Sequence, residues 1–546
     1  MPDFASSQLA EQIWRRKQQC WAETDLWSPT WRELAEFIRP NKKRAGEVRT
    51  PGGKQTERLY DPTAVNANRK LANFLNGAVI SGSTRWFSLT TGDDADLMRD
   101  HEVAVWLDDT ATRMYSQFQK SNLNAVAPQA FSSLSGLGSS GIFMDERQRV
   151  APGFPGFQFR VIPLGQFACS LDGDGNVNQF YYEFELTATA AIGMFGEEKV
   201  PGYIKEAYTS RPFEKFWFTQ AIEPRPGKNG IFSTDMAYGS YIIEHREKSI
   251  VREKGFLEMP FFVPRWDTEE GEVYGRGCGH IALPDIRTLN KVKELGLQAL
   301  ALQVRPPLQV PQDGVLGGTA RLTPAAQNVM IGDREIKPID LGHDLKSEMV
   351  KGEELRESIK SCFHRDIVEP LSKNYMTATE VIQALELVYR ELGPTLGNIQ
   401  TGWLKPMVDR AFNMMYRAGA FLPVPEQLAG ANLAIEYEGP LARAQRTGDM
   451  TALQTALALT AGVAQMDPQA VDNIDSDEVI RYQWEVLGIP TRILRKSGDI
   501  KKIRESRAQA AEASAQAEQA QAVMDVAHTG AQAGKTMQEA QQVGNA

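Results

Sequence analysis

Several patterns that mark secreted proteins, membrane proteins and metal sites are missing from this 546-residue sequence. The four cysteines (Cys20, Cys169, Cys278 and Cys362) lie far apart without a C-x-x-C pair, which argues against a disulfide framework and a zinc site. No apolar run reaches about 18 residues, so we expect no membrane span. Residues 1–16 lack the apolar core of a secretory signal. A reducing cytoplasm fits these absences.

Basic residues are not in excess either. Lysine and arginine number 60 against 69 acidic residues, which gives a net charge of -9. A protein that grips nucleic acid by neutralising phosphates should be basic, so tight and general DNA binding is disfavoured. A weakly repulsive wall would still let DNA slide, and an acidic balance also aids solubility by itself.

No catalytic or metal-binding constellation stands out. The six histidines are scattered, with no H-E-x-x-H and none at metal spacing from a cysteine. Four oxygen-bearing residues follow the spacing of an EF-hand calcium loop: Asp172, Asp174, Asn176 and Glu183. Val177 stands where that loop needs glycine for its sharp turn, so an Asp-Gly-Asp-Gly hairpin turn is the better interpretation.

Two glycine-rich segments approach known motifs without matching them. Residues 530–536 are one residue short of a phosphate-binding loop, and no apolar strand precedes them. Residues 136–141 approach the G-x-S-x-G elbow, but position 142 is isoleucine, and a helix-to-strand turn explains them. We therefore predict a protein that is not an enzyme and that uses no cofactor.

What the sequence does contain is an alternation of helical and β-rich segments. Trp-rich helices are predicted for residues 8–40, further helices for 61–82 and 100–120, and a strand for 86–89. Asp61 is a good N-cap, and Pro62 suits the first helical position that follows it. Residues 141–264 change to short runs rich in β-forming residues with Gly, Pro and Asp turns, which predicts a mostly antiparallel β region. The strands expected there are 157–163, 178–185, 203–209, 238–247 and 259–264.

Two amphipathic helices then enclose a small β excursion. Residues 283–303 predict the first helix, which ends at Pro306-Pro307, and residues 310–341 predict short strands and turns. Residues 346–372 predict the second helix, about 40 Å long at 1.5 Å per residue. Its apolar residues fall on one face: Leu355, Ile359, Phe363, Ile367 and Leu371.

The segment from Met376 to Arg446 reads as a bent helix and a return strand. Thr377 and Glu380 form a T-x-x-E capping box, and Gly393-Pro394 predicts a kink or a break. A buried stripe then resumes at Leu404, Met407, Ala411 and Met414. Residues 441–504 predict more helix. From Glu505 onward about half of the residues are Ala or Gln, typical of either a helix bundled with its copies or disorder.

The segment from Met376 to Arg446 closely resembles the head-to-tail connector, or portal, proteins of short-tailed bacteriophages. Four other stretches carry the same resemblance and occur in the order of that family: residues 60–72, 85–89, 283–290 and 306–308. The resemblance covers roughly residues 10 to 500. It implies an α+β portal fold with long helices and a mostly antiparallel β region, built into a cyclic ring of usually twelve copies.

The resemblance also implies a division of the chain. Residues 1–282 would form N-terminal helices and a β-rich wing. Two stem helices, residues 283–305 and 346–372, would flank a clip at 306–345. A tunnel loop at 373–376 would lead into a long kinked wing helix and return strand at 377–440. Residues 441–504 would form a helical crown, and 505–546 a tail that is a crown barrel or disordered.

Site residues and partners follow from the same resemblance. Lys373, Asn374 and Tyr375 of the tunnel loop would face the DNA channel, and Gln312, Asp313 and Gly314 of the clip would contact the terminase or the tail. The implied partners are further copies of this chain, the terminase large subunit, tail adaptor and tail tube proteins, major capsid and scaffold proteins, and double-stranded DNA, with no membrane. The chain would assemble in the host cytoplasm and act in the virion, at one capsid vertex. The alternatives are another virion ring or tail adaptor protein, and a cytoplasmic hydrolase with an unrecognised site.

Overall fold

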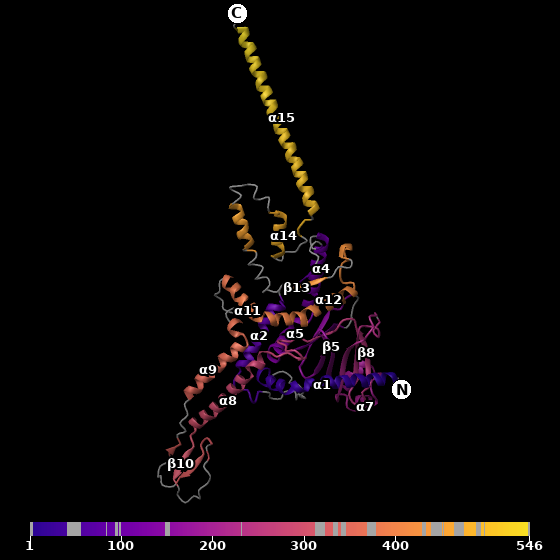
Figure 1. The fold of residues 1–546 in the computed structure, drawn as a ribbon, viewed down its shortest axis with the longest axis vertical. Helices are drawn as coiled ribbons and strands as arrows, with labels where there is room; N and C mark the ends of the chain where they lie inside the picture. Colours follow the sequence, from indigo (N-terminus) through magenta and orange to yellow (C-terminus); the bar gives the residue numbers. More distant parts are fainter. Residues whose placement is uncertain are drawn as a thin grey trace. The chain divides into compact units, whose positions relative to one another are not determined.

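The chain folds into two compact units. The larger comprises residues 1–88, 110–422 and 435–449, and the smaller comprises residues 89–109, 423–434 and 450–546. The computed structural model (Figure 1) describes residues 4–40, 56–82, 84–92, 97, 100–147, 153–230, 232–311, 321, 323–330, 337–339, 345–368, 378–428, 433–437, 450, 452–462, 474–486, 493–495 and 497–543. It is an α+β protein, as predicted.

The N-terminal helices follow the prediction with one difference. α1 (Phe4–Ile38) is a single helix of 35 residues that passes through Pro29, rather than several shorter helices. α2 (Thr63–Val79) begins just after Pro62, and the Asp61 carboxylate accepts the Thr63 N–H at 2.9 Å. Asp61 therefore satisfies a backbone donor at the start of α2, although Pro62 rather than Asp61 is the N-cap residue. α4 (His101–Lys120) confirms the helix predicted at residues 100–120, and its apolar face is buried through Val103, Leu107, Met114 and Phe118.

The predicted antiparallel β region is confirmed as two sheets. The first contains five strands, β4 (Phe167–Leu171), β5 (Val177–Thr187), β6 (Lys215–Pro224), β7 (Tyr238–Glu244) and β8 (Ile250–Phe256), paired in chain order. The second contains β3 (Phe157–Ile162), β2 (Gly141–Glu146) and β9 (Phe261–Phe262), with β2 in the centre. β1 (Phe87–Thr90) pairs with β13 (Ala434–Tyr437), the start of the predicted return strand, in a further two-stranded sheet.

The prediction of a strand at residues 203–209 is wrong. The segment is helix α7 (Gly202–Ser210), which follows α6 (Ala188–Phe195). Aromatic and β-branched residues favoured a strand, but Ile204 and Ala207 are both buried, and a spacing of three is a helical period. The two helices pack on one face of the five-stranded sheet, where Phe218 and Ile242 belong to their core.

The other face of the five-stranded sheet is covered by α1. Tyr181, Ala221 and Tyr241 of three neighbouring strands form a core with Ile13 of that helix. Side chains alternate between the faces of a strand, so residues one position away, such as Tyr182 and Gln220, point to the side of α6 and α7. The sheet is thus closed by α1 on one side and only partly covered on the other.

α8 (Cys278–Val304) starts earlier than predicted. The Gly277 N–H donates to His280 Nδ1 at 3.1 Å, which satisfies a backbone donor at its start. The α8 backbone meets the end of α5 (Leu123–Leu137) without intervening side chains. Gly138, at φ +87°, has its missing Cβ position 2.0 Å from the Gly275 carbonyl oxygen, and that of Gly279 lies 2.1 Å from the Gly136 carbonyl oxygen. Only glycine allows this approach.

The second long helix is shorter than predicted. α9 (Leu345–Cys362) runs beside α8 (Figure 1), and at 18 residues it spans about 27 Å instead of about 40 Å. His364 adopts a left-handed conformation at φ +53°, which interrupts the helix before α10 (Arg365–Val368). Ile359 and Phe363 of the predicted apolar row are buried. Between α8 and α9, β10 (Leu308–Pro311) pairs in parallel with β11 (Gln327–Met330) and antiparallel with β12 (Lys337–Pro338), which confirms the predicted short strands.

Of the kink or break predicted at Gly393-Pro394, the break is not observed. α11 (Ala378–Ile399) continues through Pro394, and a π turn at Gln400–Leu404 then joins it to α12 (Lys405–Arg417). The irregular turn precedes Pro406, whose ring excludes a regular hydrogen bond to the carbonyl four residues back. The stripe predicted at Leu404, Met407, Ala411 and Met414 is buried. The predicted capping residue Thr377 lies outside the described residues.

The smaller unit is mostly helical in its described part. Residues 452–462 are helical, and α14 (Ser476–Val486) is tied to α15 (Ser497–Val543) by Arg504, whose Nη2 lies 2.6 Å from Asp477 Oδ1. α15 has 47 residues and would be about 70 Å long. Of the two alternatives for residues after Glu505 the helix is observed, and the boundary predicted there falls inside it. In the described residues we find no helix with the length and apolarity of a membrane span.

Candidate functional site

The site residues taken from the resemblance cannot be placed. Lys373, Asn374 and Tyr375 lie outside the described residues, between the end of α10 at Val368 and the start of α11 at Ala378. Gln312, Asp313 and Gly314 also lie outside them, directly after β10. The division into wing, stem, clip, tunnel loop and crown therefore stays a prediction.

The weak motif candidates are all explained by local structure. Asp172 Oδ1 accepts the N–H groups of Asp174 and Asn176 at 3.0 and 2.8 Å, so the EF-hand-like segment is the predicted hairpin turn between β4 and β5. Residues 530–536 lie within α15 rather than in a loop. Residues 136–141 form the predicted turn from α5 to β2. In the described part of the chain no three His, Cys, Asp or Glu side chains are grouped as metal ligands.

An unpartnered apolar surface runs along α8. Ile281, Leu295, Leu297, Leu300 and Val304 are exposed there, with exposed fractions from 46% to 71%. On the neighbouring α9, Val350 is exposed as well. Leu297, Leu300 and Val304 share one face near the end of α8, because residues three and four apart lie on the same side of a helix.

The base of α8 and α9 is held to α2 by a charged cluster. Arg356 of α9 donates through Nε and Nη2 to Asp61 Oδ2, at 3.0 and 2.9 Å. Although burial works to raise the pKa of the Asp61 carboxyl, hydrogen bonds from Thr63 and Arg356 hold it below its usual value. Asn290 of α8 accepts the backbone N–H groups of Tyr60 and Asp61. The start of α2 is thereby fixed to both long helices.

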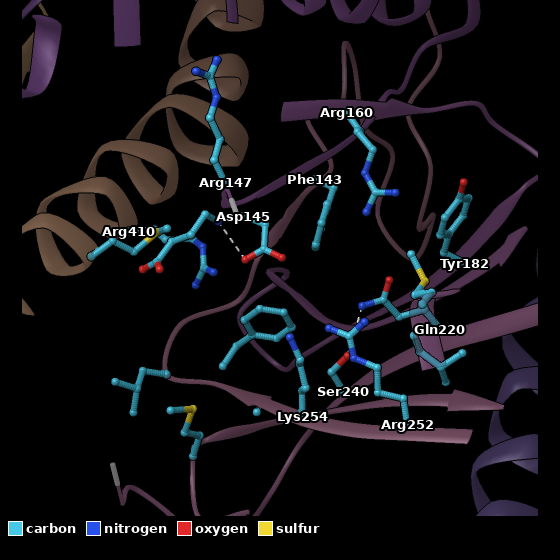
Figure 2. A pocket seen from close by; sticks show the side chains of 18 of the residues that line it. Phe143, Asp145, Arg147, Arg160, Tyr182, Gln220, Ser240, Arg252, Lys254 and Arg410 are labelled. Carbon is cyan, nitrogen blue, oxygen red and sulfur yellow. Dashed lines mark hydrogen bonds between the residues drawn. The ribbon is translucent and has the colours of Figure 1, made fainter. Parts of the chain in front are cut away.

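A pocket of about 650 Å³ opens on the side of the five-stranded sheet that α6 and α7 leave uncovered. Its floor is formed by strands β5 to β8, and its walls by β2, β3 and α12. Figure 2 shows Arg160, Arg252 and Lys254 extending toward the same space from β3 and β8. Methionines and other apolar side chains line the rest: Phe143, Phe184, Leu186, Met194, Met236, Ile242, Phe256, Leu257 and Met414.

The charge of this pocket is positive. Six basic side chains line it against two acidic ones, Asp145 and Glu146. Arg410 is fully buried and donates to the Glu258 carbonyl oxygen at 2.8 Å and to Glu258 Oε2 at 3.3 Å. Arg417 Nη1 also donates to Glu258, at 2.5 Å. These two arginines therefore share one carboxylate, which offsets one of their two positive charges.

The other four pocket cations lack such a partner in the described part of the chain. Within the described residues Arg160, Arg252 and Lys254 form no ion pair with a carboxylate. The Arg160 guanidinium lies over the Phe143 ring, 4.7 Å from its centroid. Burial, together with the nearby Arg252, lowers the pKa of Lys254, and the charge of Asp145 partly opposes this shift. The pocket therefore carries an excess of positive charge, which a bound anion would offset.

An acidic turn lies elsewhere on the larger unit. The segment before α8 contains four acidic residues within six positions: Asp267, Glu269, Glu270 and Glu272. Residues 267–271 are exposed. Glu272 is paired with Arg276 at 2.5 Å, whereas Glu269 and Glu270 form no ion pair in the described part of the chain. The turn lines a shallow surface with Glu23 of α1, which places it beside the helix that closes the first face of the sheet.

Sequence reasoning missed this pocket for a clear reason. The three basic residues Arg160, Arg252 and Lys254 come from two strands that are distant in sequence. Only Arg252 and Lys254 are close to each other, in the run Ile250 to Lys254 of β8. Two basic residues spaced by two on an expected strand share a face, which is the only local signal. The strand β8 itself was not predicted.

Comparisons with known proteins agree along most of the chain. Residues 10–494 match the model of the family described as "Bacteriophage head to tail connecting protein". The chain is 28% identical over 516 residues to the "Probable portal protein" of Bordetella phage BPP-1, covering 91% of this chain and 90% of the relative. It is 27% identical over 548 residues to the "Portal protein" of Salmonella phage epsilon15, covering 97% and 96%.

Two solved structures show a weaker similarity. A chain from the neck of an empty gene transfer agent particle is 12% identical, with 76% of this chain and 92% of that chain covered and a TM-score of 0.33. A chain from the native gene transfer agent virion is 11% identical, with coverage of 71% and 95% and a TM-score of 0.30.

Proposed function

This chain belongs to the family of bacteriophage head-to-tail connecting proteins, and from that premise we propose that copies of it form the portal ring at one capsid vertex. Double-stranded DNA would be packaged and later ejected through this ring. The observation that carries the proposal is the family match over residues 10–494, which leaves little of the chain for a different activity. Similarity to portal proteins over more than 90% of the chain supports the same function.

The ring itself is supported by the exposed apolar row on α8. In a single chain Leu297, Leu300 and Val304, which share one face of the helix, are 46% to 71% exposed. Burying apolar surface stabilises by about 25 cal/mol per Å², so these side chains favour association. Identical subunits arranged around an axis would cover each row with a neighbouring subunit, and cyclic closure is the common solution for such an interface.

We expect the purified protein to form rings in solution. Twelve copies of 60.7 kDa would give roughly 730 kDa for a closed cyclic assembly. Mass photometry at micromolar concentration and moderate salt measures this mass directly, and negative-stain electron microscopy shows the axial channel. Only monomers and dimers under these conditions would contradict the proposal.

We also propose that Lys373, Asn374 and Tyr375 face the channel and meet DNA transiently. The support is their place in the sequence, a polar stretch before the Thr377 capping box, where the resemblance to portal proteins implies the tunnel loop. Strong phosphate binding would stall DNA, because a ring multiplies each charge by the number of subunits.

Replacing Lys373 by alanine should leave the ring mass unchanged, since a surface substitution alters stability by no more than about 0.5 kcal/mol. The variant should retain packaged DNA less well, measured as DNA per filled particle after storage. Lys501→Ala on the exposed part of α15 is the matched control and should retain DNA normally. A ring structure with residues 373–375 on its outer surface would refute the channel assignment.

The remaining roles follow from the portal function as proposals. The clip residues Gln312, Asp313 and Gly314 would dock the terminase large subunit during packaging, and tail adaptor and tail tube proteins afterwards. The crown and wing would contact the major capsid and scaffold proteins during assembly in the host cytoplasm. The protein would not be an enzyme, because the motor that hydrolyses ATP would be the terminase.

A further inference from the structure

The basic pocket of the larger unit has no role in the function proposed so far. It is open, and its walls are partly apolar and partly charged. Its positive charge is not fully balanced, because Arg160, Arg252 and Lys254 form no ion pair with a carboxylate among the described residues. Its methionine and phenylalanine walls suit a protein segment, since unbranched and aromatic side chains adapt to apolar groups.

The acidic turn at residues 267–272 offers the complementary charge on the same chain. Glu269 and Glu270 are exposed and unpaired in the described part of the chain. The turn lies beside Glu23 of α1 and beside Ser170 and Leu171 at the end of β4. The pocket lies on the sheet face away from α1, so one chain presents its acidic turn and its basic pocket on different sides.

We propose that the pocket receives the acidic turn of a neighbouring copy, so that Glu269 and Glu270 pair with Arg252 and Lys254 around the ring. This inference rests on the proposed ring function. A closed ring needs heterologous contacts, in which two different and complementary patches of each subunit meet. Opposite charges at such a contact fix its register and suppress wrong pairings, even where their net energy is modest.

Charge reversal on the full-length chain tests the pairing. R252E/K254E and E269K/E270K should each lower the fraction of chains found in rings about tenfold at 1 µM and low salt, as expected for like charges brought together. The variant with all four changes restores opposite charges and should form rings within about twofold of the wild type. The matched control E197K/E198K reverses another exposed acidic pair, on the 3₁₀ turn after α6, and should leave rings unaffected.

The outcomes separate the inference from the function on which it depends. A wild-type protein without rings contradicts the portal function itself. The pairing alone is overturned if neither double variant weakens the rings. It is also overturned if the variant with all four substitutions forms rings no better than the double variants. The same holds if a 20-nucleotide single strand binds wild-type rings and R252E/K254E loses that binding while its rings persist, because the pocket would then serve nucleic acid. Circular dichroism melting of every variant, with the neutral pair R252Q/K254Q, separates lost pairing from misfolding.

Discussion

Replacing Gly138 by alanine is expected to lower the free energy of unfolding of the larger unit by about 2–6 kcal/mol. About 1–3 kcal/mol comes from holding a non-glycine residue at φ +87°. A further 1–3 kcal/mol or so comes from overpacking, because the new Cβ would lie 2.0 Å from the Gly275 carbonyl oxygen. Backbone cannot move aside like a flexible side chain, so the α5 and α8 helices would have to separate.

A matched control isolates the collision from the backbone strain. Gly175, in the turn between β4 and β5, has φ +79° with open space around its missing Cβ. Gly175→Ala should therefore lose only the strain contribution, about 1–3 kcal/mol. Urea unfolding followed by circular dichroism gives both values. Equal losses for the two variants would show that the helix crossing relaxes without cost.

Arg410→Met is expected to cost about 3 kcal/mol, at the lower end of the range for breaking a buried ion pair. The side chain of Arg410 is 4% exposed, and its guanidinium links α12 to Glu258 in the segment between β8 and β9. Methionine keeps the volume but leaves Glu258 with Arg417 alone. Thermal unfolding of the variant should show the loss as a lower Tm.

Two further variants test this assignment to charge. Arg417→Met removes the more exposed arginine of the same cluster, at 38% exposure, and should cost no more than about 1 kcal/mol. The double variant R410M/E258Q removes both charges and should recover part of the stability lost by R410M, because no buried charge is then left unpaired. If R410M and R417M are equally mild, Arg410 does not hold α12 in place.

The fold could be predicted from sequence where the determining contacts are local. The helix at His101–Lys120 follows from its apolar spacing, and the start of α2 from Asp61 and Pro62. The errors arise where tertiary contacts decide. Residues 203–209 have the composition of a strand, but the core of α6 and α7 selects a helix. The left-handed His364 that ends α9 has no signal in an otherwise continuous apolar row.

The candidate sites divide in the same way. The family could be recognised from ordered short stretches, because each keeps its own turn residues and apolar spacing. The basic pocket could not, since Arg160, Arg252 and Arg410 come from two different sheets and a helix, more than 90 residues apart at each step. Only pairing of the strands brings them to one space. Charge counted over the whole chain, at -9, even points away from a basic site.

The π turn at Gln400–Leu404 sets the rotational phase between two helices. An α-helix advances about 100° per residue, whereas a wider turn with i→i+5 bonds accommodates an added residue without interrupting the helical path. Leu396 and Ile399 before the turn and Met407 and Met414 after it are all buried. Deleting one residue there, such as the exposed Thr401, should convert the turn into regular α-helix and keep Met407 in the core, whereas inserting a second residue would turn α12 by about 100°. Chain length at this point is therefore constrained in one direction, and homologues should lose a residue here more readily than they gain one.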